Sequence, residues 1–156
     1  MSAVHDYSAT IIWTGNRGAG TSGYRAYYRS WDLACSGKPV VKCSNDPFLG
    51  GDPTLYNPED MLISSLSACH MLWYLHLASD TGIIVECYCD TPLAQGETLK
   101  NRASRFISAT LKPEITLRAG ADRKLADELH HEVHQFCFIA RSVNFPIEYA
   151  AKYSIA

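Results

Sequence analysis

The sequence predicts an α+β fold with mainly antiparallel strand pairing. Three observations support this class: β-branched and aromatic runs fill the N-terminal third, one long helical segment follows them, and further strand-like runs then surround a second helical segment. Such grouping is typical of α+β proteins rather than of doubly wound parallel sheets. The chain of 156 residues contains no repeat or long linker, so we expect one domain over residues 1–156.

The first third of the chain predicts three strands. Residues 7–14 and 23–33 are rich in aromatic and β-branched side chains, with the glycine-rich segment 15–20 between them, which indicates a hairpin. A third strand is expected at Val40–Ser44. Residues 45–56 contain two prolines and two adjacent glycines and therefore predict a surface loop.

The strongest local signal predicts a helix from Pro58 to Ser79. Asn57 is a suitable N-cap, Pro58 suits the first helical position, and two acidic residues follow in the first turn. Apolar residues lie on all sides of this helix, so we expect a central helix that is covered on nearly every side. Serine and histidine side chains interrupt its apolar runs, which argues against a membrane span.

The remaining elements follow from periodicity. Residues 83–91 and 105–117 are expected as strands, the second with a bend at Pro113. Helical spacing returns over residues 122–141, and residues 147–155 alternate between apolar and polar side chains as a strand does.

Composition excludes several classes of protein. With 47% hydrophobic and 19% charged residues the chain is too apolar for disorder. The net charge of −2 removes the long-range attraction that nucleic acid binding requires. The N-terminus lacks the basic and apolar regions of a secretory signal, so we expect a cytoplasmic protein.

The six cysteines require an explanation other than a disulfide framework, which is typical of short secreted chains. Cys69 lies in the first predicted helix and Cys137 on the apolar face of the second. If both helices pack on one sheet, the two thiols can approach each other as a redox pair, which needs Cα atoms within about 7 Å. Periodicity alone favours the other interpretation, in which both are small buried side chains.

Metal and phosphate sites are not expected. His130 and His134 lie one helical turn apart, but the HExxH pattern is absent, and solvated histidines beside a carboxylate explain this run more simply. Gly15, Gly18 and Gly20 do not form the GxGxxG pattern and precede an expected strand. No metal ligands and no cofactor-binding residues are therefore assigned.

Three segments resemble the OsmC and organic hydroperoxide resistance family. NPEDML at 57–62, followed by Ser67-Ala68-Cys69, is similar to the family signature NPEE-L-x(6)-AC. The segment HQFCFIARSVNFPI contains Cys137 at the place of the family's second cysteine, and IIWTGNRGAGTSGY resembles its opening hairpin. The resemblance covers essentially the whole chain. It implies antiparallel sheets wrapped around two long central helices in an intertwined homodimer.

The resemblance also implies an activity, the reduction of organic hydroperoxides by two cysteines. Cys69 would attack the peroxide as a thiolate and become a sulfenic acid, and Cys137 would condense with it to a disulfide. A dithiol, which in characterised relatives is a lipoylated protein, would reduce that disulfide. No metal, haem or flavin is implied. The alternative is a catalytically inert dimer of the same fold that binds a small apolar ligand in its interfacial pocket.

A thiolate in an apolar site needs a positive neighbour, and the family uses an arginine held by a glutamate. Arg17 best matches the family's hairpin position, Arg29 is the alternative, and either is equally consistent with a surface residue packed on a tyrosine. Glu59 matches the glutamate. In a continuous helix Glu59 lies roughly 15 Å from Cys69, so we expect it to reach the site from the partner subunit.

The sequence departs from the family pattern beside both cysteines. His70 replaces a bulky apolar residue, and Phe138 stands where proline is frequent. Successive helical residues point about 100° apart, so we expect His70 to line the pocket or to be structural rather than catalytic. The sequence assigns no role to Cys35, Cys43, Cys87 and Cys89.

Overall fold

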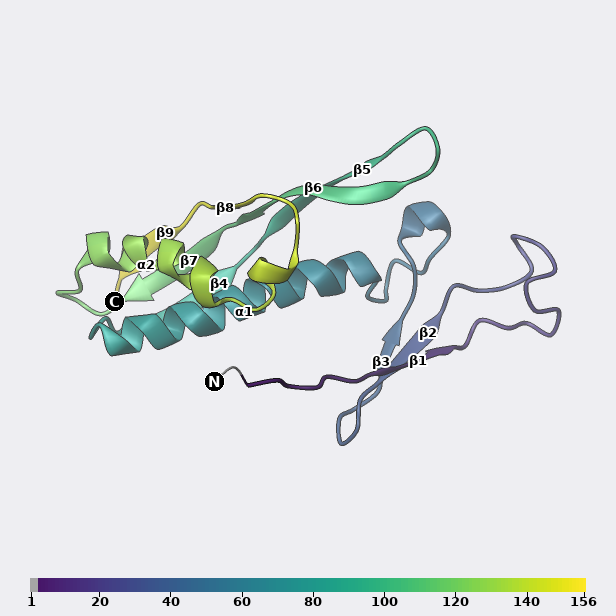
Figure 1. Cartoon of the computed structure of the whole chain (residues 1–156), viewed down its shortest axis with the longest axis horizontal. Helices are drawn as coiled ribbons and strands as arrows, with labels where there is room; N and C mark the ends of the chain where they lie inside the picture. Colours follow the sequence, from purple (N-terminus) through teal and green to yellow (C-terminus); the bar gives the residue numbers. More distant parts are fainter. Residues whose placement is uncertain (1–2) are drawn as a thin grey trace. The chain divides into compact units, whose positions relative to one another are not determined.

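The computed structural model describes residues 3–156 of the chain (Figure 1). The chain divides into two compact units, Met1–Met61 and Leu62–Ala156. The expectation of one domain over residues 1–156 stays a prediction.

The N-terminal unit contains a three-stranded antiparallel sheet of order β1-β2-β3. Its strands are β1 (Thr10–Trp13), β2 (Trp31–Ala34) and β3 (Val41–Cys43). The expected hairpin and third strand are therefore confirmed, but the strand predicted over 23–33 is much shorter.

A long connection between β1 and β2 accounts for the shorter second strand. The backbones of Gly15 and Tyr28 lie against each other, with the Tyr28 amide donating to the Gly15 carbonyl at 2.9 Å. A Cβ atom at Gly15 would lie 1.8 Å from the Tyr28 carbonyl oxygen, so only glycine fits there. Aromatic residues before position 31 therefore belong to this loop despite their strand propensity.

The predicted loop over residues 45–56 contains one short 3₁₀ helix, η1 (Pro47–Leu49). Helix α1 (Pro58–Asp80) follows it and ends one residue beyond the predicted Ser79. Its predicted N-cap is confirmed, because the Asn57 side chain accepts the Asp60 amide at 2.7 Å.

Only one row of α1 is buried within this chain. The buried side chains are Leu66, His70, Tyr74 and Ala78, which recur at helical i, i+4 spacing. Leu72 on another face is 63% exposed. The prediction of a helix covered on nearly every side is therefore wrong for α1 within residues 3–156, where its other apolar side chains are only partly buried or exposed.

Helix α1 also meets the length and composition criteria for a membrane span, with a mean hydropathy of 1.2 over its 18-residue window. The core helix of a soluble protein meets the same criteria. The expectation that α1 does not span a membrane stays a prediction.

The C-terminal unit contains two three-stranded sheets of order β4-β7-β9 and β5-β6-β8. The pairs β4–β7 and β5–β6 are antiparallel, whereas β6–β8 and β7–β9 are parallel. The α+β class with mainly antiparallel pairing is confirmed, and the two parallel pairs make the sheets of this unit mixed. The strands are β4 (Val85–Asp90), β5 (Leu93–Thr98), β6 (Ser104–Leu111), β7 (Pro113–Leu117), β8 (Ile147–Tyr149) and β9 (Lys152–Ile155).

The chain passes from one sheet to the other after one or two residues at three places: from β4 to β5, from β6 to β7 and from β8 to β9. Strand β6 ends at Leu111 and β7 begins at Pro113, which confirms the bend predicted there. The predicted strand over 147–155 is likewise divided into β8 and β9. The parallel register is the same on both sides of this break, since Ala109 pairs with Ile147 and Glu114 with Lys152.

The Asp90 carboxylate connects the step between β6 and β7 to α1 through two hydrogen bonds. Its two oxygens accept the backbone amide of Lys112, at 2.7 Å, and the Ser67 hydroxyl. Ser67 lies two residues before Cys69 on α1.

Helix α2 (Arg123–Phe136) ends earlier than the predicted Arg141. Asp122 caps its N-terminus by accepting the Leu125 amide at 3.1 Å. A short 3₁₀ helix, η2 (Ala140–Ser142), follows. The fully buried apolar residues of this unit come from both helices and the sheets: Leu66, Tyr74, Ala109, Leu111, Leu117, Ala126, Leu129, Val133 and Cys137.

Candidate active site

The C-terminal unit brings Cys69 and Cys137 near each other, since Cys69 packs against the core cluster that contains Cys137 and its thiol affects the pKa of Cys137. Cys69 lies near the middle of α1 and is partly exposed, whereas Cys137 follows α2 and is completely buried. Two residues far apart in the sequence therefore meet at one place. Both are free thiols in this structure.

Cys137 lies at the C-terminal cap of α2 and not on a helix face, which corrects the sequence-based placement. Its backbone is extended, with φ −64° and ψ 109°, and its amide donates to the Val133 carbonyl at 2.8 Å. The chain then turns back, so that the Ala140 amide donates to the Cys137 sulfur at 3.4 Å. Backbone N–H groups thus face this sulfur.

The pKa of Cys137 is raised to about 11, first by burial and second by the neighbouring Cys69 thiol. The amides of Ala140 and Ile139 act in the opposite direction because they stabilise the thiolate. Cys137 therefore keeps its proton at neutral pH. Cys69, the more exposed sulfur, is the one that an external reactant can reach.

Aromatic side chains lie beside the two cysteines. The rings of Trp73 and Phe136 are stacked with centroids 5.1 Å apart, and both residues are partly accessible. Trp73 lies one helical turn after Cys69, and Phe136 directly precedes Cys137. This pair gives the neighbourhood of the dithiol an apolar surface.

His70 does not line an open pocket but lies in the core, where it is 1% exposed. Its Nε2 atom is 2.8 Å from Nδ1 of His130, which is 2% exposed. The interpretation of His130 as a solvated helix residue is therefore wrong. Burial lowers the pKa of His70 to about 3 and that of His130 to about 4, so both imidazoles are uncharged at neutral pH.

Glu59 lies exposed in the first turn of α1. The helix is unbroken from Pro58 to Asp80, so Glu59 and Cys69 of one chain are separated by about 15 Å of helix. Within residues 3–156, no ion pair involves Glu59. Its role at the thiolate stays a prediction.

Arg17 and Arg29 both pack on tyrosines of the N-terminal unit. The Arg17 guanidinium lies over the Tyr28 ring at 4.9 Å. Arg29 lies over Tyr24 at 4.2 Å and Tyr27 at 4.9 Å, and it donates to the carbonyl oxygens of both. These are the packing arrangements that the sequence left open for each arginine. The assignment of Arg17 to the Cys69 thiolate, with Arg29 as the alternative, stays a prediction.

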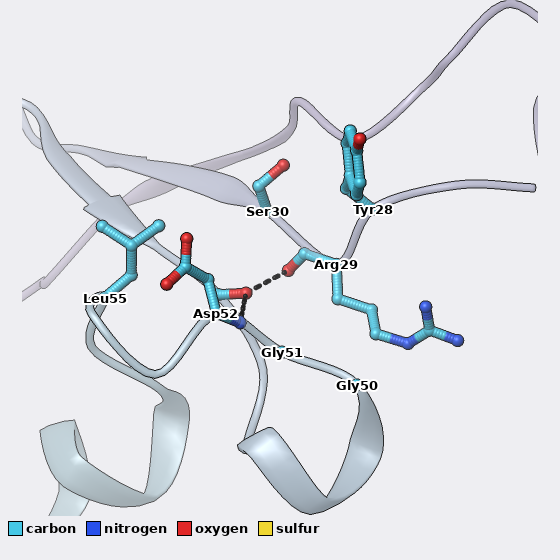
Figure 2. A pocket seen from close by; sticks show the side chains of 8 residues that line it. Tyr28, Arg29, Ser30, Gly50, Gly51, Asp52 and Leu55 are labelled. Carbon is cyan, nitrogen blue, oxygen red and sulfur yellow. Dashed lines mark hydrogen bonds between the residues drawn. The ribbon is translucent and has the colours of Figure 1, made fainter. Parts of the chain in front are cut away.

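The N-terminal unit contains a cavity of about 420 Å³ that is lined by no cysteine (Figure 2). The Ser44 hydroxyl, which is among the lining groups, accepts the Asp52 amide at 2.9 Å and donates to the Arg29 carbonyl at 3.5 Å. The lining residues are Tyr28, Arg29, Ser30, Ser44, Gly50, Gly51, Asp52 and Leu55.

The other four cysteines belong to no metal-binding cluster within the described residues. Across residues 3–156, no group of three or more His, Cys, Asp or Glu side chains is placed to hold a metal ion. Cys43 is buried, Cys35 is partly buried, and Cys87 and Cys89 are exposed on β4.

A family model described as OsmC-like protein matches residues 51–151, which include both Cys69 and Cys137. The chain belongs to the OsmC-like family. The resemblance found in the sequence is thereby confirmed. No curated protein matches the chain.

Solved structures of OsmC-like proteins share the fold at low identity. An OsmC-like protein of unknown function from Vibrio cholerae is 22% identical with a TM-score of 0.84, and the match covers 96% of this chain and 100% of that one. An organic hydroperoxide resistance protein from Elizabethkingia anophelis is 18% identical with a TM-score of 0.71, over 100% of both chains. A Legionella pneumophila protein described as organic hydroperoxide resistance protein OsmC is 16% identical with a TM-score of 0.69, over 98% and 99%.

Proposed function

We propose that this OsmC-like protein is a cysteine-based peroxidase that reduces organic hydroperoxides to alcohols. The observation that carries the proposal is the proximity of the Cys69 and Cys137 thiols, one partly exposed and one buried. Family membership and the similarity to two organic hydroperoxide resistance proteins support it. The apolar Trp73–Phe136 surface suits a hydroperoxide with an organic tail.

In the first step, the Cys69 thiolate attacks the distal oxygen of the hydroperoxide. The O–O bond breaks, the alkoxide takes a proton and leaves as an alcohol, and Cys69 becomes a sulfenic acid. Because Cys137 keeps its proton, its S–H group is available to donate a hydrogen bond to the Cys69 sulfur as that sulfur ionises.

In the second step, the Cys137 sulfur attacks the Cys69 sulfenic acid. The S–O bond breaks, the Cys137 proton joins the departing hydroxyl as water, and a Cys69–Cys137 disulfide forms. An external dithiol, such as a lipoylated protein, then reduces the disulfide by thiol–disulfide exchange. The cycle needs no metal or organic cofactor bound to the protein.

The proposal includes an intertwined cytoplasmic homodimer in which the Arg17 guanidinium stabilises the Cys69 thiolate and Glu59 orients that arginine. Glu59 would come from the partner subunit, since about 15 Å of helix separates it from Cys69 of its own chain. Apolar side chains on β1 support a second copy as the partner, because Ile11 and Ile12 are 60% and 50% exposed in the single chain.

Cysteine variants test the peroxidase. We expect C69S to lose more than about 100-fold of its hydroperoxide consumption with a dithiol reductant, because the nucleophile is absent. C137S should complete one turnover and accumulate a Cys69 sulfenic acid that dimedone traps. C35S is the matched control and should retain full turnover. Unchanged turnover in C69S would refute the peroxidase and favour the alternative, an inert dimer that binds an apolar ligand.

A further inference from the structure

The most unusual buried feature of the C-terminal unit is a pair of histidines that joins its two helices. His70 of α1 and His130 of α2 have nearly parallel rings, with an interplanar angle of 7° and a hydrogen bond of 2.8 Å between Nε2 and Nδ1. One imidazole donates to the other. The remaining ring nitrogen of His130, Nε2, is buried without a hydrogen-bond partner within the described part of the chain.

Aromatic rings hold both imidazoles in place. Tyr149 of β8 stacks on His70 with centroids 4.7 Å apart, and Tyr74 stacks on His130 at 4.4 Å. Neither imidazole can rotate freely in such a setting. The hydrogen bond therefore fixes one direction and one separation between the helices.

A buried pair of imidazoles stabilises a core less than apolar side chains do. Desolvating two imidazoles and leaving one nitrogen unpaired opposes folding, whereas apolar side chains of similar volume carry no such penalty. Unlike apolar packing, a hydrogen bond constrains both distance and angle. The geometry thus favours a positioning role over a purely stabilising one.

We propose that the His70–His130 hydrogen bond is a positioning device that sets the separation of the Cys69 and Cys137 sulfurs. This inference rests on the proposed function, in which those sulfurs form a disulfide. His70 directly follows Cys69 on α1, and His130 of α2 lies about two turns before Cys137, the C-cap residue of that helix. A shift of either helix along the other would therefore change both the imidazole pair and the thiol pair.

Tyr149 links the two pairs a second time. It stacks on His70. Its pKa is raised first by burial and second by the charge that Cys137 carries when ionised, so Tyr149 lies within electrostatic range of that sulfur as well. The histidines and the dithiol therefore share a neighbour in addition to the two helices.

The test is the equilibrium of the Cys69–Cys137 disulfide with dithiothreitol in the variants H70L, H130L and H70L/H130L. We expect the effective concentration of the two thiols to fall about tenfold or more in all three, because small displacements of reacting groups carry penalties of this size. The control H134L removes an exposed histidine from the same helix and should stay within about twofold of the wild type.

The double variant separates positioning from stability, because it leaves no imidazole buried without a partner. A folded double variant with an unchanged effective concentration would overturn the inference. No peroxide enters this measurement. The two proposals can therefore fail separately. A wild type that forms the disulfide but does not reduce hydroperoxides would refute only the peroxidase. Variants with an unchanged effective concentration of the two thiols would refute only the positioning role.

A second measurement needs no variant to fold. Nitrogen-15 NMR of the histidine rings in the wild type should show two neutral imidazoles at pH 6, joined by one N–H···N hydrogen bond. If each ring instead titrates independently with a pKa near the ordinary value of 6.5, the inference is overturned. Two protonated imidazoles have only N–H donors, so no nitrogen remains to accept the hydrogen bond.

Discussion

At the scale of single residues, burial distinguishes the two sulfurs of the candidate site. Cys137 is completely buried, and its pKa is raised to about 11, so it is suited to keep its proton until a neighbouring sulfur has been oxidised. Cys69 is partly accessible on α1. The order of events in the proposed cycle follows from this difference.

Alkylation of the native protein checks that difference. At pH 8, iodoacetamide should modify the exposed Cys87 and Cys89 well before Cys137, because only a thiolate that the reagent can reach reacts. Peptide mass spectrometry over time gives the order. In urea the difference should disappear. Native Cys137 reacting as fast as Cys87 would contradict the burial.

Sequence reasoning could name the two cysteines but not their geometry. The NPEDML segment and the spacing to Cys69 pointed to the first, and the resemblance pointed to Cys137. The His70–His130 pair was missed because the run His130-His131-Glu132-Val133-His134 is mainly polar, although α2 turns His130 inward and His134 outward. The signal for His130 is its helical spacing, four residues after the buried Ala126 and three before the buried Val133.

At the scale of elements, local capping signals predict where α1 begins. The positions of the strands depend instead on pairing between segments that are distant in the sequence. Asn57 and Pro58 set the start of α1 within the sequence itself. Strand β5 was missed because Leu93–Thr98 contains no aromatic or β-branched run. Its strand conformation comes from antiparallel pairing with β6, which no short window of sequence reveals.

The N-cap of α2 provides a test at this scale. Asp122 accepts the Leu125 amide, so D122A should lower the free energy of unfolding by about 1 kcal/mol. D122N, which retains a capping oxygen, should lie within a few tenths of a kcal/mol of the wild type. Urea denaturation measures both. Equal losses in the two variants would show that the cap does not contribute.

Packing of α2 in the core provides a larger effect. Leu129 is completely buried, and L129A should destabilise the protein by about 2–5 kcal/mol through lost contacts and a residual cavity. The neighbouring exposed residue Glu128 is the control, since E128A should change the free energy of unfolding by less than about 0.5 kcal/mol. A small effect of L129A would mean that α2 is not packed on this core.

At the scale of the whole molecule, the buried histidines make folding dependent on pH. Their pKa values of about 3 and about 4 lie below the ordinary value of 6.5, so the unfolded chain binds protons first as the pH falls. The neutral imidazoles therefore contribute fully to the free energy of unfolding above pH 6.5. Below pH 6.5 this free energy decreases, by about 2 kcal/mol per imidazole at pH 5.

Denaturant unfolding at pH 7 and pH 5 measures this loss. The variant H70L/H130L should show a much weaker dependence, because the groups that titrate in the unfolded state are gone. Other titratable groups around the pair are Tyr74, Asp127, His131, His134 and Tyr149. Equal pH dependence in the wild type and the double variant would assign the effect to those groups instead.

Association is the second property of the whole molecule. If a second copy covers β1, replacing Ile11 and Ile12 together by lysine should produce monomers in sedimentation experiments. T10K, at an exposed position of the same strand, is the control and should leave the sedimentation coefficient unchanged. Monomers in the wild type would remove the proposed partner subunit as the source of Glu59.

The shared register of β6–β8 and β7–β9 makes the junction at Lys112 intolerant of changes in length. One extra residue between Leu111 and Pro113 would slide β7 by one position against β9, and successive strand residues face opposite ways. Ile115 and Leu117, now buried, would turn to the solvent. Homologous chains of this architecture should therefore vary in length in their loops and keep this one-residue step unchanged.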